Sequence, residues 1–298
     1  AVGSGSLALN TTGADNTAVG KDALTTDDLG RKSTAIGQGS LFSQNSASAV
    51  DTYNVGCGYQ TGYHNVTGTG NTYVGYHVGN GVSGNSNSSN TGMGREAMFG
   101  ITTGDTNTCI GFAAGVSITS GDNNVFLGGN SGRAGSPGGA ITTGSNEIVI
   151  GDENITEAHV QVDWTVQSDA RDKTDFTALD LGLDFVKALA PVTYKWDKRS
   201  KYGDKTADDY DLNAQSPDGT HKEDWLDIGF KAQEVEALEI AAGYDKDNKT
   251  NLVASHSGDG KQMGLQYSKF IPILVKAIQE QNALIESLTA RITTLEGE

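Results

Sequence analysis

A short phrase that ends in glycine recurs along the first half of the chain, and this repeat constrains the possible folds more than any other feature. Four clear copies are Asn-Thr-Ala-Val-Gly at 16–20, Ser-Thr-Ala-Ile-Gly at 33–37, Asn-Thr-Tyr-Val-Gly at 71–75 and Asn-Thr-Cys-Ile-Gly at 107–111. Looser copies end at Gly3, Gly56, Gly94, Gly128 and Gly151, so successive glycines are 17, 17, 19, 19, 19, 17, 17 and 23 residues apart. Because a unit this short cannot bury its own apolar face, neighbouring copies must stack.

The pattern inside each copy predicts one coil of a β-solenoid. A polar residue, a small or variable one, an aliphatic one and then glycine fit a short strand with alternating faces. A second short segment follows, as at 21–24 or 38–41, before a turn such as 102–106. Two short strands and two turns per copy predict nine stacked coils of a β-roll over residues 1–155. Each coil buries only one or two aliphatic residues, so we expect three chains to associate along one wall.

The composition changes near residues 163–168, which marks a domain boundary. Residues 1–167 hold 31 of the 40 glycines and only five of the 21 basic residues, whereas residues 168–298 hold sixteen of those basic residues. We therefore expect a shaft at 1–155, a connector at 156–167 and a second domain at 168–298. Since the chain starts at Ala1 without a signal peptide, we expect it to be a fragment of a longer protein.

Charge and composition exclude several classes of function. With 37 acidic and 21 basic residues, the net charge of −16 argues against a nucleic-acid partner. The chain contains no apolar run near the ~20 residues that cross a bilayer, so we expect no membrane insertion. Cys57 and Cys109 make neither a disulfide framework nor a metal site, and we expect both to be buried at similar places in the repeat. No cofactor and no metal is predicted.

Residues 1–155 resemble the heads of trimeric autotransporter adhesins and the repeat shafts of phage tail fibres. The resemblance implies a left-handed parallel β-roll in a trimer. The resemblance does not indicate which ligand the shaft would bind. The copies depart from regularity at 83–90 and 133–140, where extra residues are either exposed binding loops or simple insertions on a solenoid surface.

The segment between the repeats and the C-terminal helix predicts a small α+β domain. Residues 179–190 have helical spacing and stop before Pro191. Strands are expected at 192–196 and 227–230, and a helix at 232–238. Residues 198–223 form a polar loop that could project. Residues 252–256 and 263–267 are expected to form a hairpin around a turn at 258–260.

The last 32 residues predict a coiled coil. From Tyr267 onward, apolar residues follow a 4-3 spacing over about four heptads. Ile at a and Leu at d alone favour two strands, but the trimeric shaft leads us to expect three. The predicted seam consists of Ile271, Leu274, Ile278, Gln281, Ile285, Leu288, Ile292 and Leu295.

Three phrases in order suggest the chemistry of the second domain. Ser-Asp-Ala-Arg-Asp-Lys at 168–173, which alone is typical of a cap or turn, is followed by Ala-Pro-Val-Thr-Tyr-Lys-Trp at 190–196 and Ile-Gly-Phe-Lys-Ala-Gln-Glu-Val-Glu at 228–236. With the coiled coil, this array resembles the C-terminal intramolecular chaperone of phage tail spikes and fibres, a self-cleaving peptidase family, over residues 168–298.

The resemblance implies a role for particular residues. The chaperone of that family trimerises, guides assembly of a β-rich shaft and is then cut off just before a serine. Carried onto this chain, the bond between Gln167 and Ser168 is cut, Ser168 is the nucleophile and Lys173 is its general base. Asp169 and Arg171 are expected to have positioning roles only. Gln233 and Glu234 are expected to make fold or trimer contacts.

The sequence thus favours a fragment of a bacteriophage tail fibre or tail spike. Such a homotrimer would be assembled in the host cytoplasm, would become part of the virion and would meet a host receptor or glycan through its shaft. Its only activity would be a single-turnover autoproteolytic serine endopeptidase. Two alternatives remain, a trimeric cell-surface adhesin head and a glycan-degrading tail spike, although no pair of carboxylates stands out for the latter.

Overall fold

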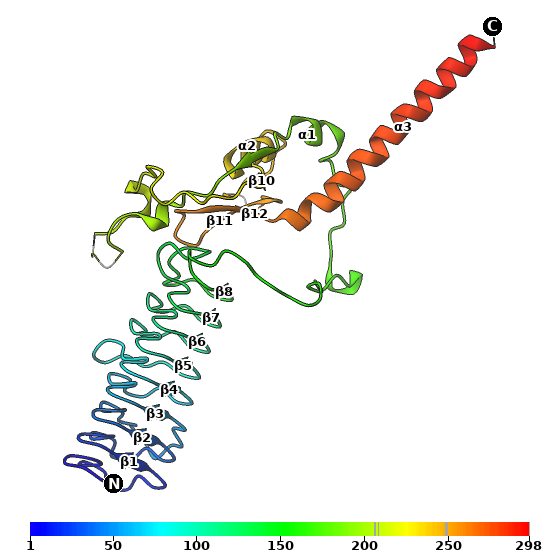
Figure 1. Ribbon diagram of the computed structural model, residues 1–298. Helices are drawn as coiled ribbons and strands as arrows, with labels where there is room; N and C mark the ends of the chain where they lie inside the picture. The colour runs from blue at the N-terminus through cyan, green and yellow to red at the C-terminus, as the bar shows by residue number, and fades with distance from the viewer. Residues whose placement is uncertain (206, 208, 248–249, 298) are drawn as a thin grey trace. The chain divides into compact units, whose positions relative to one another are not determined.

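The computed structural model describes residues 1–205, 207, 209–247 and 250–297, which form two compact units. The first unit contains residues 1–156 together with the described parts of 198–221 and 257–262. The second contains residues 157–197, 222–256 and those from 263 onward. The first is a solenoid of stacked coils, and the second is a small α+β domain that ends in a long helix (Figure 1). The predicted fold class is therefore confirmed.

Eight short strands form one parallel sheet in which each strand pairs with the next in sequence order (Figure 1). The register pairs equivalent residues of successive repeats, so Ala18 lies opposite Ala35 and Cys109 opposite Phe126. About seven complete turns lie between the first strand and the last, fewer than the nine coils predicted. The first copy forms no strand in this sheet: it joins the second copy through an isolated bridge between Val2 and Val19 and through turn hydrogen bonds such as that from the Leu7 N–H to the Ala23 carbonyl oxygen at 3.1 Å. The strands are β1 (Thr17–Val19), β2 (Thr34–Ile36), β3 (Val55–Cys57), β4 (Thr72–Val74), β5 (Thr91–Met93), β6 (Thr108–Ile110), β7 (Val125–Leu127) and β8 (Ile148–Ile150).

Each coil contains one strand, not the two that the sequence predicted. The segments at 21–24 and 38–41 are turns. Leu24 and Leu41 both have φ of 51°, in the left-handed region that a strand cannot contain. This conformation lets both leucines point inward and be buried. The second segment of the repeat therefore supplies core residues without adding a second sheet.

The repeat that follows Gly37 ends at Gly58, not at Gly56 as predicted. Gly58 has φ of +135°, and the Cβ built on Gly37 would meet the Gly58 backbone. Gly56 instead occupies the buried middle position of β3, opposite Ala35 and Tyr73. The sequence Val-Gly-Cys-Gly offers two glycines, and only the second lies where successive backbones approach too closely for a side chain.

A ladder of buried asparagines explains the polar residue that opens many copies. The backbone N–H of each asparagine donates to the side-chain oxygen of the previous one, at 3.0 Å from Asn90 to Asn71, 2.8 Å from Asn107 to Asn90 and 3.0 Å from Asn124 to Asn107. The Asn107 side-chain amide also donates to the Gly121 carbonyl at 2.8 Å. Because these amides are buried and hydrogen-bonded, they join successive coils without an orphaned polar group.

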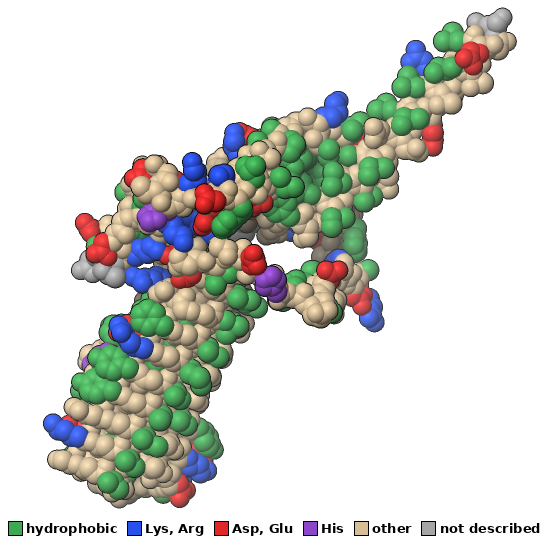
Figure 2. Space-filling model, in the orientation of Figure 1, with side chains coloured by type: hydrophobic (Ala, Val, Ile, Leu, Met, Phe, Trp, Pro, Cys, Tyr) green, Lys and Arg blue, Asp and Glu red, His purple; other side chains and the backbone are tan. Residues whose placement is uncertain are grey.

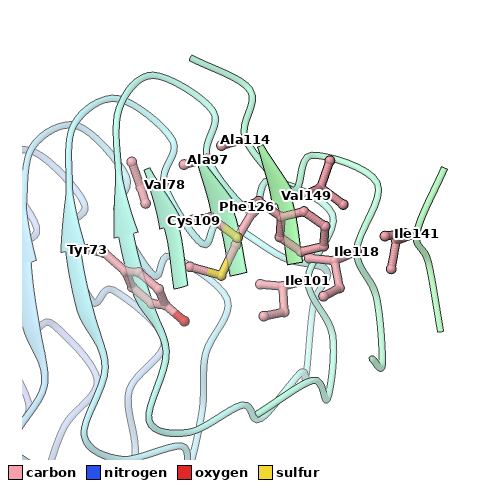
Figure 3. Packing of buried hydrophobic residues seen from close by; sticks show 11 residues of the cluster. Tyr73, Val78, Ala97, Ile101, Cys109, Ala114, Ile118, Phe126, Ile141 and Val149 are labelled. Atoms are coloured by element: carbon pink, nitrogen blue, oxygen red, sulfur yellow. The ribbon is translucent and has the colours of Figure 1, made fainter. Parts of the chain in front are cut away.

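The middle residue of each strand points into the solenoid, as the alternating pattern predicted. Tyr73, Cys109 and Phe126 belong to one buried cluster with side chains from the turns (Figure 3). The two cysteines do not occupy similar places, contrary to prediction. Cys109 is the buried middle residue of β6, whereas Cys57 is the third residue of β3 and is half-buried.

The two irregular stretches of the solenoid are largely packed. In residues 83–90, Asn85, Asn87 and Asn90 are buried. In residues 133–140, Gly135, Ser136 and Gly139 are buried. These burials favour packed insertions over freely exposed binding loops, and Gly135 and Gly139 lie against Ser200 and Asp259 of the later segments 198–221 and 257–262.

The second unit follows the predicted order of elements with shorter bounds. Its first helix covers half of the predicted 179–190, because Gly182 is not helical (φ −135°, ψ −133°) and the chain becomes extended at Leu189, before Pro191. Strands β9 and β10 are antiparallel, as are β11 and β12, which form the predicted hairpin. The elements are α1 (Leu183–Ala188), β9 (Val192–Tyr194), β10 (Asp227–Gly229), α2 (Ala232–Ala241), β11 (Ala254–His256), β12 (Met263–Leu265) and α3 (Phe270–Glu296).

The core of the second unit lies between its three helices and the hairpin. Phe185 of α1, Val235 of α2 and Ile273 of α3 are buried in one cluster. The first turns of α3 are thereby fixed to the domain. Among the described residues, no helix is both long enough and apolar enough to span a bilayer.

The polar loop predicted at 198–223 does not simply project. Its described residues up to 221 belong to the first unit, together with the solenoid. Positions 206 and 208 lie outside the described residues. Two short 3₁₀ turns order this loop, at Arg199–Lys201 and Leu212–Ala214.

Candidate functional site

The predicted nucleophile and the predicted base lie next to each other at residues 168–173. The Lys173 Nζ donates to the Ser168 Oγ at 2.6 Å and to the Ser168 carbonyl oxygen at 3.3 Å. A 3₁₀ turn at Ala170–Asp172 folds the chain back and brings the two side chains together. The short spacing of this motif is therefore enough to form the contact locally.

Asp169 and Arg171 build the turn that joins this pair. The Asp169 carboxylate accepts the Arg171 backbone N–H at 2.9 Å and the Arg171 Nη2 at 2.6 Å. These two hydrogen bonds hold the pKa of Asp169 below its usual range, with the bond from the Arg171 side chain as the larger cause. Among the described residues, neither Asp169 nor Arg171 makes a hydrogen bond to the Ser168 hydroxyl, and their positioning roles stay a prediction.

The environment of the pair limits what it can do chemically in a single chain. Both Ser168 and Lys173 are exposed. A lysine can accept a proton from a hydroxyl only when its amine is neutral, and removal of water is one way to favour the neutral form. Among the described residues, no hydrogen bond reaches the Gln167 carbonyl oxygen, where negative charge would develop during attack. The pair has the right atoms in contact, and its surroundings are still those of a surface turn.

The other two phrases form the scaffold of the same unit. The phrase at 190–196 supplies β9, and the phrase at 228–236 supplies β10 and the start of α2. Gln233 and Glu234 lie on the exposed face of α2, where Glu234 pairs with Lys231 at 2.7 Å. No hydrogen bond among the described residues joins either one to the turn at 168–173. The predicted fold or trimer contacts of Gln233 and Glu234 stay a prediction.

Sequence reasoning missed Glu239, a buried carboxylate in the last turns of α2. Its side chain is only 1% exposed and accepts the backbone N–H groups of Leu252, Val253 and Ala254 at 2.9, 2.6 and 2.9 Å. Glu239 therefore fixes the start of the hairpin against α2. The predicted helix ended at 238, three residues before the observed end at Ala241, and so left Glu239 out. The signal available was that Glu239 lies four residues after the apolar Val235, on the same helix face.

The predicted seam of α3 is exposed over its whole length. Its apolar members are between 43% and 72% exposed, while Phe270, Ile273 and Ala277 on another face are buried in the domain. The helix therefore has one face for its own domain and a second apolar face without a described partner. The apolar seam residues are Ile271, Leu274, Ile278, Ile285, Leu288, Ile292 and Leu295.

One comparison with known families finds a match in the second part of the chain. Residues 168–244 match a peptidase family described as chaperone of endosialidase. The match begins at Ser168 and includes both later phrases, so it supports the predicted resemblance of residues 168–244 to the intramolecular chaperone family. The comparison with curated proteins and the comparison with solved structures each find no match.

Proposed function

We propose that this chaperone domain brings three copies of the chain together, guides the folding of their β-solenoid shafts and then cuts itself off between Gln167 and Ser168. The whole would be part of a bacteriophage tail fibre or tail spike. The shaft would meet the host receptor or glycan. The observation that carries the proposal is the 2.6 Å contact between the Ser168 hydroxyl and the Lys173 amine at the first residues of the family match.

The exposed face of α3 supports self-association. Full burial of an aliphatic side chain contributes about 1.5–3 kcal/mol, so burying the half-exposed seam residues would contribute roughly 1 kcal/mol each. Ile285 and Leu288 are both 54% exposed and belong to the 4-3 pattern of the seam. A helix that is already fixed to its domain at Phe270 and Ile273 would present this seam at a defined angle.

The outer face of the sheet supports association of the shafts as well. The third residues of several strands form an apolar row on the solenoid (Figure 2). Each is more exposed than a core residue would be, between 39% and 58%. Three thin solenoids could bury these rows together. The residues concerned are Val19, Ile36, Met93, Ile110 and Ile150.

The proposed cut proceeds through an ester. The neutral Lys173 amine takes the proton of the Ser168 hydroxyl, and the oxygen attacks the Gln167 carbonyl carbon. The peptide bond to the Ser168 nitrogen breaks, the Lys173 ammonium returns the proton to that nitrogen, and an ester links Gln167 to the Ser168 oxygen. Water then hydrolyses the ester, releasing the Gln167 carboxylate and the Ser168 hydroxyl. Each chain reacts once.

Assembly would supply the condition that the single chain lacks. A lysine amine acts as a base only in its neutral form, and removal of water favours that form. Ser168 and Lys173 are exposed in the single chain, whereas burial against two further chains could remove water from the amine. The cut would then follow correct assembly.

Two substitutions test the proposed chemistry. The unsubstituted chain is expected to give fragments 1–167 and 168–298 by intact mass spectrometry, and Ser168→Ala is expected to give one uncut chain. Lys173→Met should also remain uncut. Lys187→Met is the matched control, because Lys187 pairs only with the exposed Asp184 on α1. An unsubstituted, assembled chain that stays uncut refutes the peptidase, and a Lys173→Met chain that is cut at the normal rate refutes the base assignment.

A further inference from the structure

Two segments that follow the proposed cut in sequence lie on the last coil of the solenoid. They are the described parts of 198–221 and the turn at 257–262 between β11 and β12 (Figure 1). We call them the cap segments. They are also joined to each other, since Arg199 donates to the Lys261 carbonyl oxygen at 2.7 Å and Lys261 pairs with Asp211 at 2.8 Å.

The cap segments hold a buried carboxylate of the shaft. Glu153, just after β8, is only 7% exposed and forms an ion pair with Lys205 of the cap. Lys198 donates to the Glu153 carbonyl oxygen at 2.9 Å, and Lys201 donates to the Asn154 side chain at 2.7 Å. Three lysines of one cap segment therefore converge on two adjacent residues of the shaft.

A second set of contacts involves the insertion at 133–140. Asp259 of the cap accepts the Ala140 backbone N–H at 3.1 Å, and Arg133 donates to the Lys205 carbonyl oxygen at 2.9 Å. A Cβ on Gly135 would lie 2.8 Å from the Ser200 Cβ, so a side chain there would push the cap away. The glycines of this insertion thus allow the cap to approach the shaft backbone.

The shaft cation near the cap lysines is Arg133, which donates to the Asn130 side chain and to the Lys205 carbonyl oxygen. Between Arg133 and Arg171 the sequence contains no lysine and no arginine. The final stretch of the shaft before the proposed cut therefore supplies no cation of its own to Glu153. A carboxylate that is buried and then left unpaired is strongly unfavourable. Loss of the cap would remove the Lys205 partner of Glu153 and leave its carboxylate without an ion pair among the described residues.

We propose that the chaperone domain stays on the shaft as a non-covalent cap after the chain is cut, and that the Lys205–Glu153 pair is its main anchor. A solenoid needs a cap at its open end, and here that cap comes from the far side of the cut. Retention of the cap after self-cleavage rests on the proposed function. The contact between the cap segments and the end of the shaft does not depend on whether the chain cuts itself. The partner that this surface fits is the shaft end of the same protein.

The test separates retention from self-cleavage. The recognition sequence of a site-specific protease is inserted within 157–167 of the Ser168→Ala chain, so that an added protease makes the cut. The two fragments are expected to co-elute in size-exclusion chromatography at physiological salt. Fragments that separate at once on cutting would overturn the proposal. Failure of self-cleavage would leave this test unaffected.

The anchor is tested in the same background. Lys205→Met and Glu153→Gln are each expected to speed release of the cap fragment by roughly 30-fold or more, as for other buried charge pairs. Because the two residues act through one pair, the double variant should release it no faster than the single ones. The control is Lys222→Met at an exposed position. Equal release rates for Lys205→Met and Lys222→Met, or additive effects in the double variant, would overturn the anchor.

Discussion

Replacing Glu239 by alanine is expected to destabilise the second unit far more than the loss of an exposed carboxylate of α2. The substitution removes the acceptor of three buried backbone N–H groups, at Leu252, Val253 and Ala254. Each orphaned buried donor costs about 1–3 kcal/mol, and partial entry of water lowers the total. We therefore expect a loss of about 3–5 kcal/mol in the free energy of unfolding of the second unit. For a domain of this size, that corresponds to a fall of roughly 10–20 °C in Tm.

The matched control is Glu234→Ala in the same helix. Glu234 is exposed and pairs only with Lys231, so its loss should change the stability by about 0.5 kcal/mol or less. Thermal unfolding followed by circular dichroism and calorimetry, in the uncut Ser168→Ala background, gives both values. If Glu239→Ala and Glu234→Ala unfold within 3 °C of each other (about 1 kcal/mol), the carboxylate does not hold the hairpin as described.

Three other perturbations address the seam, the ladder and the turn. Ile285→Asp should leave the chain monomeric and uncut, as judged by light scattering and mass spectrometry. Ser287→Asp, which lies off the seam, should leave both assembly and cutting unchanged. Cutting by an Ile285→Asp monomer would contradict the coupling of the cut to assembly. Asn107→Ala should lower the free energy of unfolding of the shaft by about 2–4 kcal/mol in chemical denaturation, because it breaks the ladder at a buried position. The control is Thr103→Ala at an exposed position. Equal effects of the two substitutions would contradict the role of the asparagine ladder. The lowered pKa of Asp169 means that its contribution to the turn is complete above about pH 4 and is lost as the pH falls through the lowered value. NMR titration of the Asp169 carboxyl group should give a pKa below the usual 3.8, and a measured pKa at or above 3.8 would contradict the hydrogen bonds described for the turn.

The repeat allowed the solenoid to be predicted because each coil repeats the same local requirement. A buried middle residue in each strand and a glycine directly after the strand recur from coil to coil, and equivalent positions pair in the sheet. The prediction failed where two glycines compete, at Gly56 and Gly58, since only the contact with the next coil distinguishes them. It also failed at Leu24, where a left-handed backbone turns an apparent strand into a corner.

The site was predictable where its contacts are local. Ser168 and Lys173 are five residues apart, and the turn that joins them is encoded by the residues between them. The role of Glu239 and the packing of the loop at 198–221 were not predictable in the same way. Their partners lie 13–15 residues away for the carboxylate and 45 residues away for the Lys198 contact. A sequence pattern carries no sign of such pairing until the fold brings the two parts together.

The central claim is that association of three chains arms the Ser168 hydroxyl. The most direct test measures the assembly mass and the cut fraction on the same sample over a dilution series. The account predicts that cut polypeptide appears only at concentrations where the mass is three times that of the 31.1 kDa chain. Cutting ahead of Ser168 that proceeds at the same rate in samples with the mass of a single chain would contradict it.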